Sequence, residues 1–188
     1  MSDGGHRSTL RIALLVYLPM LASGLWLRAP GTLRIADPVA LAWGLLAAAA
    51  IGAAVVAGSR RIARRTGWGR RLHAEFHAIL GRLESRQILL LSLLSGFGEE
   101  VLFRGVLQPR LGLWPASLLF AALHFPARRA LLPWTAFALG IGLVLGLLTE
   151  WAGSLWPAIV LHFLINYFNL HDLAEPPSAP ERPGPQAG

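Results

Sequence analysis

Residues 87–107, QILLLSLLSGFGEEVLFRGVL, form an apolar run of the length that a helix needs to cross a lipid bilayer. The run nevertheless contains two adjacent glutamates, Glu99 and Glu100, and an arginine four positions later, Arg104. A charged side chain costs about 2.5–3.5 kcal/mol at the centre of a membrane helix, so those that occur there are candidates for function. This stretch therefore predicts a membrane helix with a polar site inside it.

Further apolar runs recur along the 188-residue chain, in which 54% of residues are hydrophobic and only 14% are charged. A soluble domain usually carries about 25% charged residues. The predicted fold class is all-α, a polytopic transmembrane helical bundle of about six spans. The expected spans are Leu10–Leu27, Pro38–Gly58, Gln87–Leu107, Leu113–Phe125, Leu131–Thr149 and Ser154–Leu170. The fourth is too short to cross about 30 Å of hydrocarbon, so we expect it to be buried among other helices with its end inside the bundle.

The basic residues indicate the orientation of these spans. All 17 are arginines, and the net charge is +7. If both termini are cytoplasmic (N-in and C-in), most of the arginines lie inside, as the positive-inside rule requires, and only Arg28, Arg34 and Arg110 lie outside. Because the charges lie between apolar runs, nucleic acid is not an expected partner. The sequence thus predicts a multi-pass integral protein in contact with the lipid bilayer, and we expect a bacterial inner membrane.

Three regions follow from this pattern. Residues 1–86 hold two N-terminal spans and a basic cytoplasmic stretch, in which the apolar spacing of Leu72–Leu80 predicts an interfacial helix. Residues 87–173 form the catalytic transmembrane core, and residues 174–188 form a Pro-rich tail expected to be disordered. The sequence gives no indication of oligomeric state. Cysteine is absent, which excludes disulfides, thiolate metal sites and a cysteine nucleophile.

Few other polar residues lie inside the core spans: His124 near the end of the fourth, and His162 and Asn166 in the sixth. His162 and Asn166 are four apart and therefore share a helix face, as Glu100 and Arg104 do. Counted along their helices, Glu99, His124 and His162 all fall near mid-depth, so we expect them to converge in one cavity.

Each of these motifs also has a structural interpretation. Glu100 and Arg104 could be a buried ion pair that fixes helix packing, His124 an ordinary packed side chain, and His162 and Asn166 an interhelical hydrogen-bonding pair. Glu99 points about 100° away from the Glu100–Arg104 pair, so that pair does not neutralise it. An unpaired carboxyl in an apolar span is a candidate general base.

Other polar positions are interpreted more simply. His73 and His77 are four apart, as metal ligands can be, but we interpret them as an exposed or interfacial helix face. Glu150, His171 and Asp172 fall at span ends and are expected to be solvated. The pair Gly142 and Gly146 permits close helix packing in the fifth span.

The chain lacks the residues that several intramembrane protease mechanisms require. There is no His-Glu-x-x-His zinc motif and no Gly-x-Ser-Gly, and Asp occurs only at Asp3, Asp37 and Asp172, outside the spans. Zinc protease, rhomboid-like serine protease and aspartyl protease mechanisms of these types are therefore not expected.

The remaining pattern resembles a known family. Glu-Glu-x-x-x-Arg in one span, Phe-x-x-x-His ending at His124 in the next, and His-x-x-x-Asn in a later one resemble the CAAX-processing and bacteriocin-processing (CPBP) intramembrane proteases. This family is also called the Abi or type II CAAX prenyl endopeptidase family. The resemblance covers about Gln87 to Leu170 and implies an intramembrane endopeptidase acting on a membrane-associated peptide or protein.

Carried over by residue, the resemblance makes Glu99 the water-activating base, with Glu100 and Arg104 in supporting positions. It makes His124 the histidine that cooperates with Glu99. His162 and Asn166 match the pair that stabilises the oxyanion or helps to bind a metal. We favour a scheme without a cofactor. In the alternative, zinc would be held by His124, His162 and Glu99.

Two other functions stay open from the sequence. The first is a non-enzymatic membrane protein in bacteriocin immunity or binding, a role that the family resemblance also suggests. The second is a small transporter with Glu99 as a proton relay, although the chain shows no duplicated halves.

Overall fold

The computed structural model of the protein describes residues 3–28, 33–35, 37–125 and 131–176. Within these ranges every regular element is a helix and no strand occurs, which confirms the all-α prediction. In chain order the elements are α1 (Asp3–Leu27), α2 (Pro38–Arg65), α3 (Gly67–Leu80), α4 (Ser85–Leu102), a π-helical turn (Phe103–Leu107), α5 (Gln108–Leu111), α6 (Leu113–Leu123), α7 (Leu132–Ala152) and α8 (Trp156–Ala174). Most of the Pro-rich tail, residues 177–188, lies outside the described residues, as do Arg128, Arg129 and Arg182 from the charge analysis.

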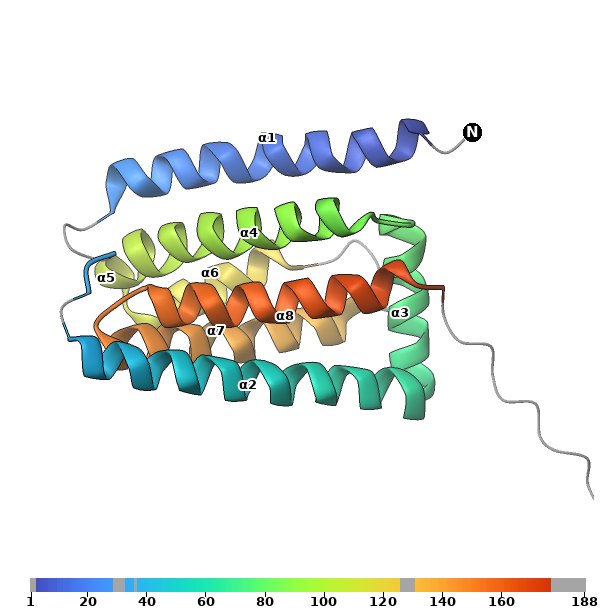
Figure 1. The fold of residues 1–188 in the computed structure, drawn as a ribbon. Coiled ribbons are helices and arrows are strands. Elements are labelled where there is room, and N and C mark those ends of the chain that lie inside the picture. Colours follow the sequence, from blue (N-terminus) through green and yellow to red (C-terminus); the bar gives the residue numbers. More distant parts are fainter. Residues whose placement is uncertain (1–2, 29–32, 36, 126–130, 177–188) are drawn as a thin grey trace, which may run out of the picture.

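Two central helices, α4 and α8, pack against each other and organise the bundle. The axes of the long helices are roughly parallel, and α1 lies along α4 while α2 lies along α8 on the opposite side (Figure 1). Helices α6 and α7 form a further packed pair, and α7 also contacts α8. The start of α1 and the end of α8 lie at the same end of the bundle, which α3 crosses almost perpendicular to the other helices (Figure 1).

The corner between α2 and α3 fixes the position of this crossing helix. Helix α2 begins at Pro38, as predicted for the second span, with Asp37 as its N-cap. It continues past Gly58 to Arg65, because arginine is a good helix former. Thr66 then leaves the helix and caps α3 by accepting a hydrogen bond from the Gly69 amide. A Cβ atom on Gly69 would lie 2.4 Å from the carbonyl oxygen of Ile62, so only glycine allows this tight corner. The interfacial helix predicted over Leu72–Leu80 therefore begins earlier, at Gly67.

The third predicted span is not one regular helix. Helix α4 ends at Leu102, and the next turn, Phe103–Leu107, is π-helical, with the Gln108 amide bonded to the Phe103 carbonyl. Pro109 has no N–H with which to continue the α-helical ladder, which favours an irregular turn at this point. Arg104 lies within the widened turn.

Two helices, α2 and α7, are long and apolar enough to cross a membrane, while α1 and α6 contain the shorter apolar segments Ala13–Leu27 and Leu113–Leu123. Glu99 and Glu100 make helix α4 less apolar. The expected burial of the short fourth span is wrong, because α6 exposes Trp114, Leu118 and Leu123 by 54–65%. Its C-terminal end does reach an internal cavity, as described below.

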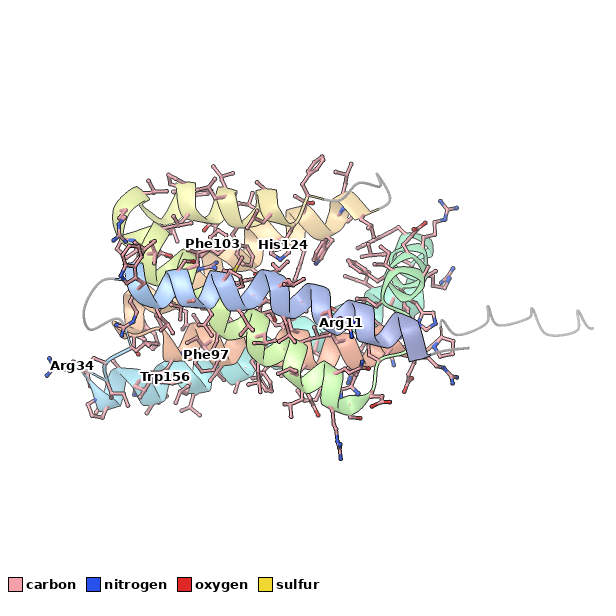
Figure 2. All side chains as sticks on the ribbon, turned by 90° about the horizontal axis from the view of Figure 1, so that it is seen from above. Arg11, Arg34, Phe97, Phe103, His124 and Trp156 are labelled. Carbon is pink, nitrogen blue, oxygen red and sulfur yellow. The ribbon has the colours of Figure 1, made fainter. Side chains whose placement is uncertain are left out.

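The core lies where α2, α6, α7 and α8 meet, and includes Phe103, Phe120, Leu145 and Leu161. A second, smaller cluster joins α4 to the start of α8, where the rings of Phe97 and Trp156 meet edge to face (Figure 2). Helix α8 therefore takes part in both apolar clusters, and the smaller cluster joins it to α4 beside the polar residues of interest.

Candidate active site

Close packing of α4 on α8 brings the polar residues of the two helices together. A Cβ on Gly96 would lie 3.4 Å from the backbone nitrogen of Phe163 and 3.5 Å from the carbonyl oxygen of Ile159. The absence of a side chain at Gly96 thus lets the two backbones approach closely. As a result Glu99 and Glu100, one turn after Gly96, both reach His162 on α8.

Glu100 belongs to a completely enclosed ionic network. Its Oε1 atom accepts a hydrogen bond from Arg104 Nη1 at 3.2 Å, so the predicted pair forms. Arg104 Nη2 donates to the Gly142 carbonyl at 2.8 Å, and the guanidinium lies over the Phe120 ring at 4.5 Å. Glu100 and Arg104 are 0% and 2% exposed, so both charges depend on these partners.

His162 links the two glutamates. Its Nδ1 atom lies 2.7 Å from Glu100 Oε1, and its Nε2 atom lies 4.0 Å from Glu99 Oε2. An ionised carboxylate can only accept, so Nδ1 carries the proton in this contact. The Nε2 atom therefore faces Glu99, in an orientation fixed by Glu100.

His124 reaches the same carboxylate from the other side. It is the C-cap of α6, and its Nδ1 lies 2.7 Å from the Phe120 carbonyl oxygen, which again requires the proton on Nδ1. Its ring is held between Phe120 and Trp134, at centroid distances of 4.5 and 4.9 Å. The Nε2 atom is 3.7 Å from Glu99 Oε2.

Glu99 Oε2 is thus the point on which both imidazoles converge. At 3.7 and 4.0 Å neither Nε2 atom is within direct hydrogen-bond distance. Oε2 is buried and has no hydrogen-bond partner among the described residues, and Tyr17 of α1 lies near Glu99 in the same cavity wall. Polar contacts longer than 3.5 Å are places where a water molecule can enter between the two atoms.

Asn166 lies one turn beyond His162 on the same face of α8. Its Nδ2 atom donates to Ser95 Oγ at 2.8 Å, and Ser95 is four residues before Glu99 on α4. Ser95 is 3% exposed and donates in turn to the Ser92 carbonyl. The Asn166 amide is therefore held on the Glu99 side of α4, with a second N–H available.

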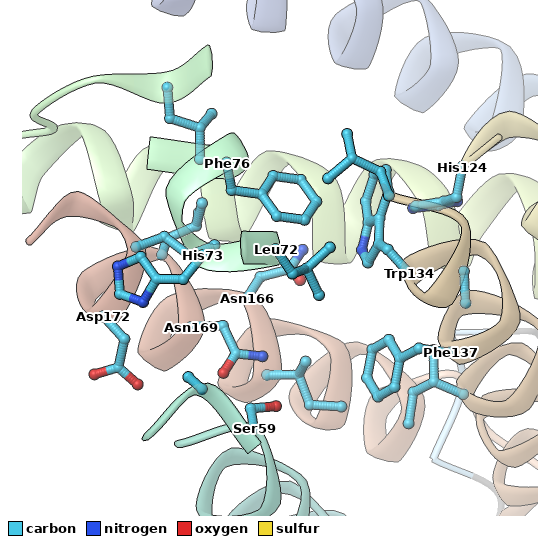
Figure 3. Close-up of a pocket in the computed structure, with 18 of the residues that line it drawn as sticks. Ser59, Leu72, His73, Phe76, His124, Trp134, Phe137, Asn166, Asn169 and Asp172 are labelled. Carbon is cyan, nitrogen blue, oxygen red and sulfur yellow. The ribbon is translucent and has the colours of Figure 1, made fainter. Parts of the chain in front are cut away.

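These groups line a cavity of about 1100 Å³ that extends to the end of the bundle crossed by α3. Figure 3 shows His124 and Trp134 at one side of the cavity, Asn166 and Asn169 in the middle, and Asp172 at the other side. Its walls also include Glu99 and His162, together with many apolar side chains of α3 and α7. Arg104 and Glu100 are outside this lining, so the structure separates the two predicted groups of charges.

The other polar residues connect helices at the α3 end. His77 Nδ1 and His73 Nε2 lie 2.8 and 3.1 Å from the carbonyl oxygens of Leu173 and Glu175, at the end of α8. Asp172, expected to be solvated, forms a half-exposed two-point salt bridge with Arg60. In the described part of the chain, no three His, Asp or Glu side chains are grouped as a metal centre.

The residues of the site that the sequence analysis missed are Ser95, Tyr17 and Gln108. Ser95 has the spacing of a same-face neighbour of Glu99, which could have identified it. Tyr17 is one of only two tyrosines in the chain, but no local pattern connects it to Glu99. Gln108 donates to the Gly146 carbonyl and to Glu150, through a contact that spans about 40 residues of chain.

Part of the chain is similar in sequence to known proteins. Residues 82–168 match the family model described as type II CAAX prenyl endopeptidase Rce1-like. A curated protein of Bacillus subtilis (strain 168), named "Uncharacterized protein YpbD", is 51% identical over 81 residues, or 42% of this chain and 41% of that protein. The chain thus spans about two fifths of the length of this curated relative. No solved structure matches.

The matched segment contains the whole constellation of Glu99, Glu100, Arg104, His124, His162 and Asn166, whereas Tyr17 lies outside it. The resemblance inferred from the three motifs is therefore confirmed over residues 82–168, the part of the chain that carries the Rce1-like, type II CAAX prenyl endopeptidase family pattern.

Proposed function

We propose that the protein is an intramembrane endopeptidase of the CAAX-protease type, in which Glu99 activates a water molecule. The observation that carries the proposal is the convergence of two imidazole Nε2 atoms on the unpartnered Glu99 Oε2 at the cavity wall. A water hydrogen-bonded to this oxygen and to His124 Nε2 would be oriented for proton transfer.

In the proposed reaction the water oxygen attacks the carbonyl carbon of the peptide, and its proton passes to Glu99. The negative charge that develops on the carbonyl oxygen is stabilised by Asn166 Nδ2 and His162 Nε2. This role requires His162 to be protonated on both nitrogens, because Nδ1 already donates to Glu100. When the tetrahedral intermediate collapses, the C–N bond breaks and the leaving amine takes the proton from Glu99. Water is thereby divided between a new carboxyl and a new amine.

A zinc-dependent scheme is the alternative, with Glu99, His124 and His162 as ligands. One carboxylate and two imidazoles suit a catalytic zinc ion, but ligand atoms around tetrahedral zinc lie roughly 3.3 Å apart, given bonds of about 2.0–2.1 Å. Glu99 Oε2 lies 3.7 and 4.0 Å from the two Nε2 atoms, so the three groups would have to move slightly closer to hold zinc. We favour the glutamate-dependent scheme because the Asn166 amide is a poor zinc ligand and a good oxyanion donor. One zinc per chain by elemental analysis, with activity lost to chelation and restored by zinc, would overturn that preference.

We also propose a multi-pass location in a bacterial inner membrane, with six spans and both termini cytoplasmic. Support comes from the two long apolar helices and from tryptophans exposed at the loop end of the bundle remote from α3: Trp26, Trp43, Trp114 and Trp151. Such aromatic residues are typical of a membrane interface. Reporter tags at both termini should be cytoplasmic, and a C-terminus on the other side would require an odd number of spans.

The proposed substrate is a membrane-associated peptide or protein cleaved close to the bilayer. The apolar lining of the cavity is suited to a hydrophobic segment next to the scissile bond. For a bacterial protein, a secreted peptide or a C-terminal sorting tag is a more natural substrate than a prenylated protein.

The test is a cleavage assay on protein purified in detergent, with a library of membrane-proximal peptides read by mass spectrometry. Wild type should cleave a subset of peptides, and Glu99→Ala and Glu99→Gln should not. Glu84→Gln, at the exposed start of α4, is the matched control and should remain active. A folded wild type that cleaves nothing in its native lipids would instead favour the non-enzymatic role in bacteriocin immunity, binding or transport.

A further inference from the structure

Tyr17 lies on α1, outside the segment that matches the family, yet it packs beside Gly98 and lines the same cavity wall as Glu99. Tyr17 is half-buried and lines the same cavity as His124 and His162. We propose that Tyr17 is a positioning residue that holds the Glu99 carboxyl with Oε2 directed at the two imidazoles. The inference rests on the proposed peptidase function.

The way α1 packs on α4 gives Tyr17 a defined place. Gly24 follows Tyr17 by seven residues, so both lie on the same face of α1. A Cβ on Gly24 would be 3.0 Å from Val101 Cγ1 and 3.2 Å from the Leu102 backbone nitrogen, so α1 touches the α4 backbone there. A second contact between α1 and α4 lies at Gly98, where a Cβ would be 3.7 Å from Tyr17 Cδ1. Small residues on both helices therefore place the phenol ring beside Glu99.

A glutamate needs such a partner to be an efficient base. The terminal torsion of a glutamate side chain is broad and roughly two-fold, so an unsupported carboxyl group rotates freely. In the described residues Oε2 has no hydrogen-bond partner, and neither imidazole is close enough to fix the group directly. In the proposed arrangement, a hydrogen bond from the Tyr17 hydroxyl to one carboxyl oxygen sets this rotation. It also leaves the other oxygen for the water.

Tyr17→Phe separates this role from simple packing, because it keeps the ring and removes the hydroxyl. We expect kcat to fall by about tenfold to a hundredfold, the effect of losing a hydrogen bond to a charged group, while KM stays within about twofold. The thermal midpoint should change little. A packing role would leave both the midpoint and kcat per folded molecule unchanged, because the ring remains.

Two further variants test the geometry. Tyr167→Phe alters the chain's other tyrosine, which stacks on Phe163 away from the cavity, and should keep wild-type kcat. Gly24→Leu should push α1 off α4 with Tyr17 intact, and should reproduce the loss of kcat. Wild-type kcat in Tyr17→Phe would overturn the proposal.

A readout independent of activity distinguishes failure of this inference from failure of the proposed function. Ultraviolet resonance Raman difference spectra, wild type minus Tyr17→Phe, report the hydrogen bond of this phenol alone. The spectrum should show a strong donor that weakens in Glu99→Gln. An unchanged spectrum in Glu99→Gln would overturn the pairing whatever the activity. A strong donor in a protein that cleaves no peptide would retain the pairing and reject the peptidase.

Discussion

Glu99 and Glu100 are adjacent on α4 and chemically identical, but they lie on two faces of the helix with opposite surroundings. On one face Glu100 contacts Arg104 and His162, within a network that extends to the Gly142 carbonyl of α7. On the other face Glu99 directs an unpartnered oxygen toward a large cavity, with two imidazoles beyond direct hydrogen-bond distance. One face is filled with protein partners, and the other leaves room for a reactant.

This difference shows how one apolar helix can hold two buried carboxyl groups. The enclosed charges compensate each other, and the resulting network orients His162 for its role beside Glu99. The Glu100 face is therefore expected to govern folding, and the Glu99 face to govern reaction. This division would be contradicted if variants on the Glu100 face changed only the reaction, or if variants on the Glu99 face changed only stability.

The largest expected effect is on hydrolysis in Glu99→Gln. The amide keeps the size of the side chain and can still accept from Tyr17, but it cannot take a proton from water, so the rate should fall by about 10²–10⁴-fold. The midpoint of thermal unfolding should stay close to wild type. Steady-state cleavage and differential scanning fluorimetry of the same sample measure both. Near-normal cleavage would mean that Glu99 is not the base.

Arg104→Ala should affect stability instead. It leaves Glu100 buried with only His162 as a partner among the described residues, which in comparable pairs costs about 3–5 kcal/mol. Denaturant unfolding in detergent, followed by circular dichroism, should show this loss. Arg71→Ala, at an exposed position of α3, is the matched control and should be close to neutral. Equal stability of the two variants would contradict the assignment of a structural role to the Glu100 face.

The sequence was sufficient for much of this comparison. Glu100 and Arg104 could be paired from their spacing, and the position of Glu99 outside that pair followed from 100° per residue. The convergence of His124 and His162 on Glu99 was expected from their depth in the spans. Local periodicity carries this information because Glu99, Glu100 and His162 lie on regular helices, and Arg104 and His124 lie within one turn of the ends of α4 and α6.

The rest depended on contacts that no local pattern encodes. The π-helical turn around Arg104 and the reach of Tyr17 to Glu99 arise from packing between helices. The burial expected for α6 was wrong because a short apolar segment can lie at the bundle surface, where it exposes one face. Hydropathy measures how apolar a segment is, and not whether protein or lipid covers it.

A smaller effect should follow from adding a methyl group at Gly146 of α7, one turn after the Gly142 carbonyl that Arg104 contacts. A Cβ at this position would lie 2.3 Å from Leu113 Cδ1 and 2.7 Å from Gln108 Oε1. Gly146→Ala should therefore destabilise the protein by about 1–3 kcal/mol through overpacking. Gly140→Ala, on the same helix with no atom within 4 Å, should be neutral or stabilising, since alanine favours helix. Unfolding midpoints of the two variants in one detergent provide the comparison.

The smallest expected effect comes from a comparison of two buried serines, Ser95 near Glu99 and Ser117 near Gly142. Ser95→Ala removes the acceptor of the Asn166 amide on the Glu99 face, which should cost about 1 kcal/mol and lower kcat severalfold as the amide loses its orientation. Ser117, 1% exposed near Gly142 on the other side, has no hydrogen-bond partner in the described residues for its buried Oγ atom. Ser117→Ala should therefore be neutral or slightly stabilising and leave kcat unchanged. Parallel cleavage and unfolding assays measure both variants. A loss of kcat in Ser117→Ala equal to that in Ser95→Ala would mean that the two faces are not functionally separate.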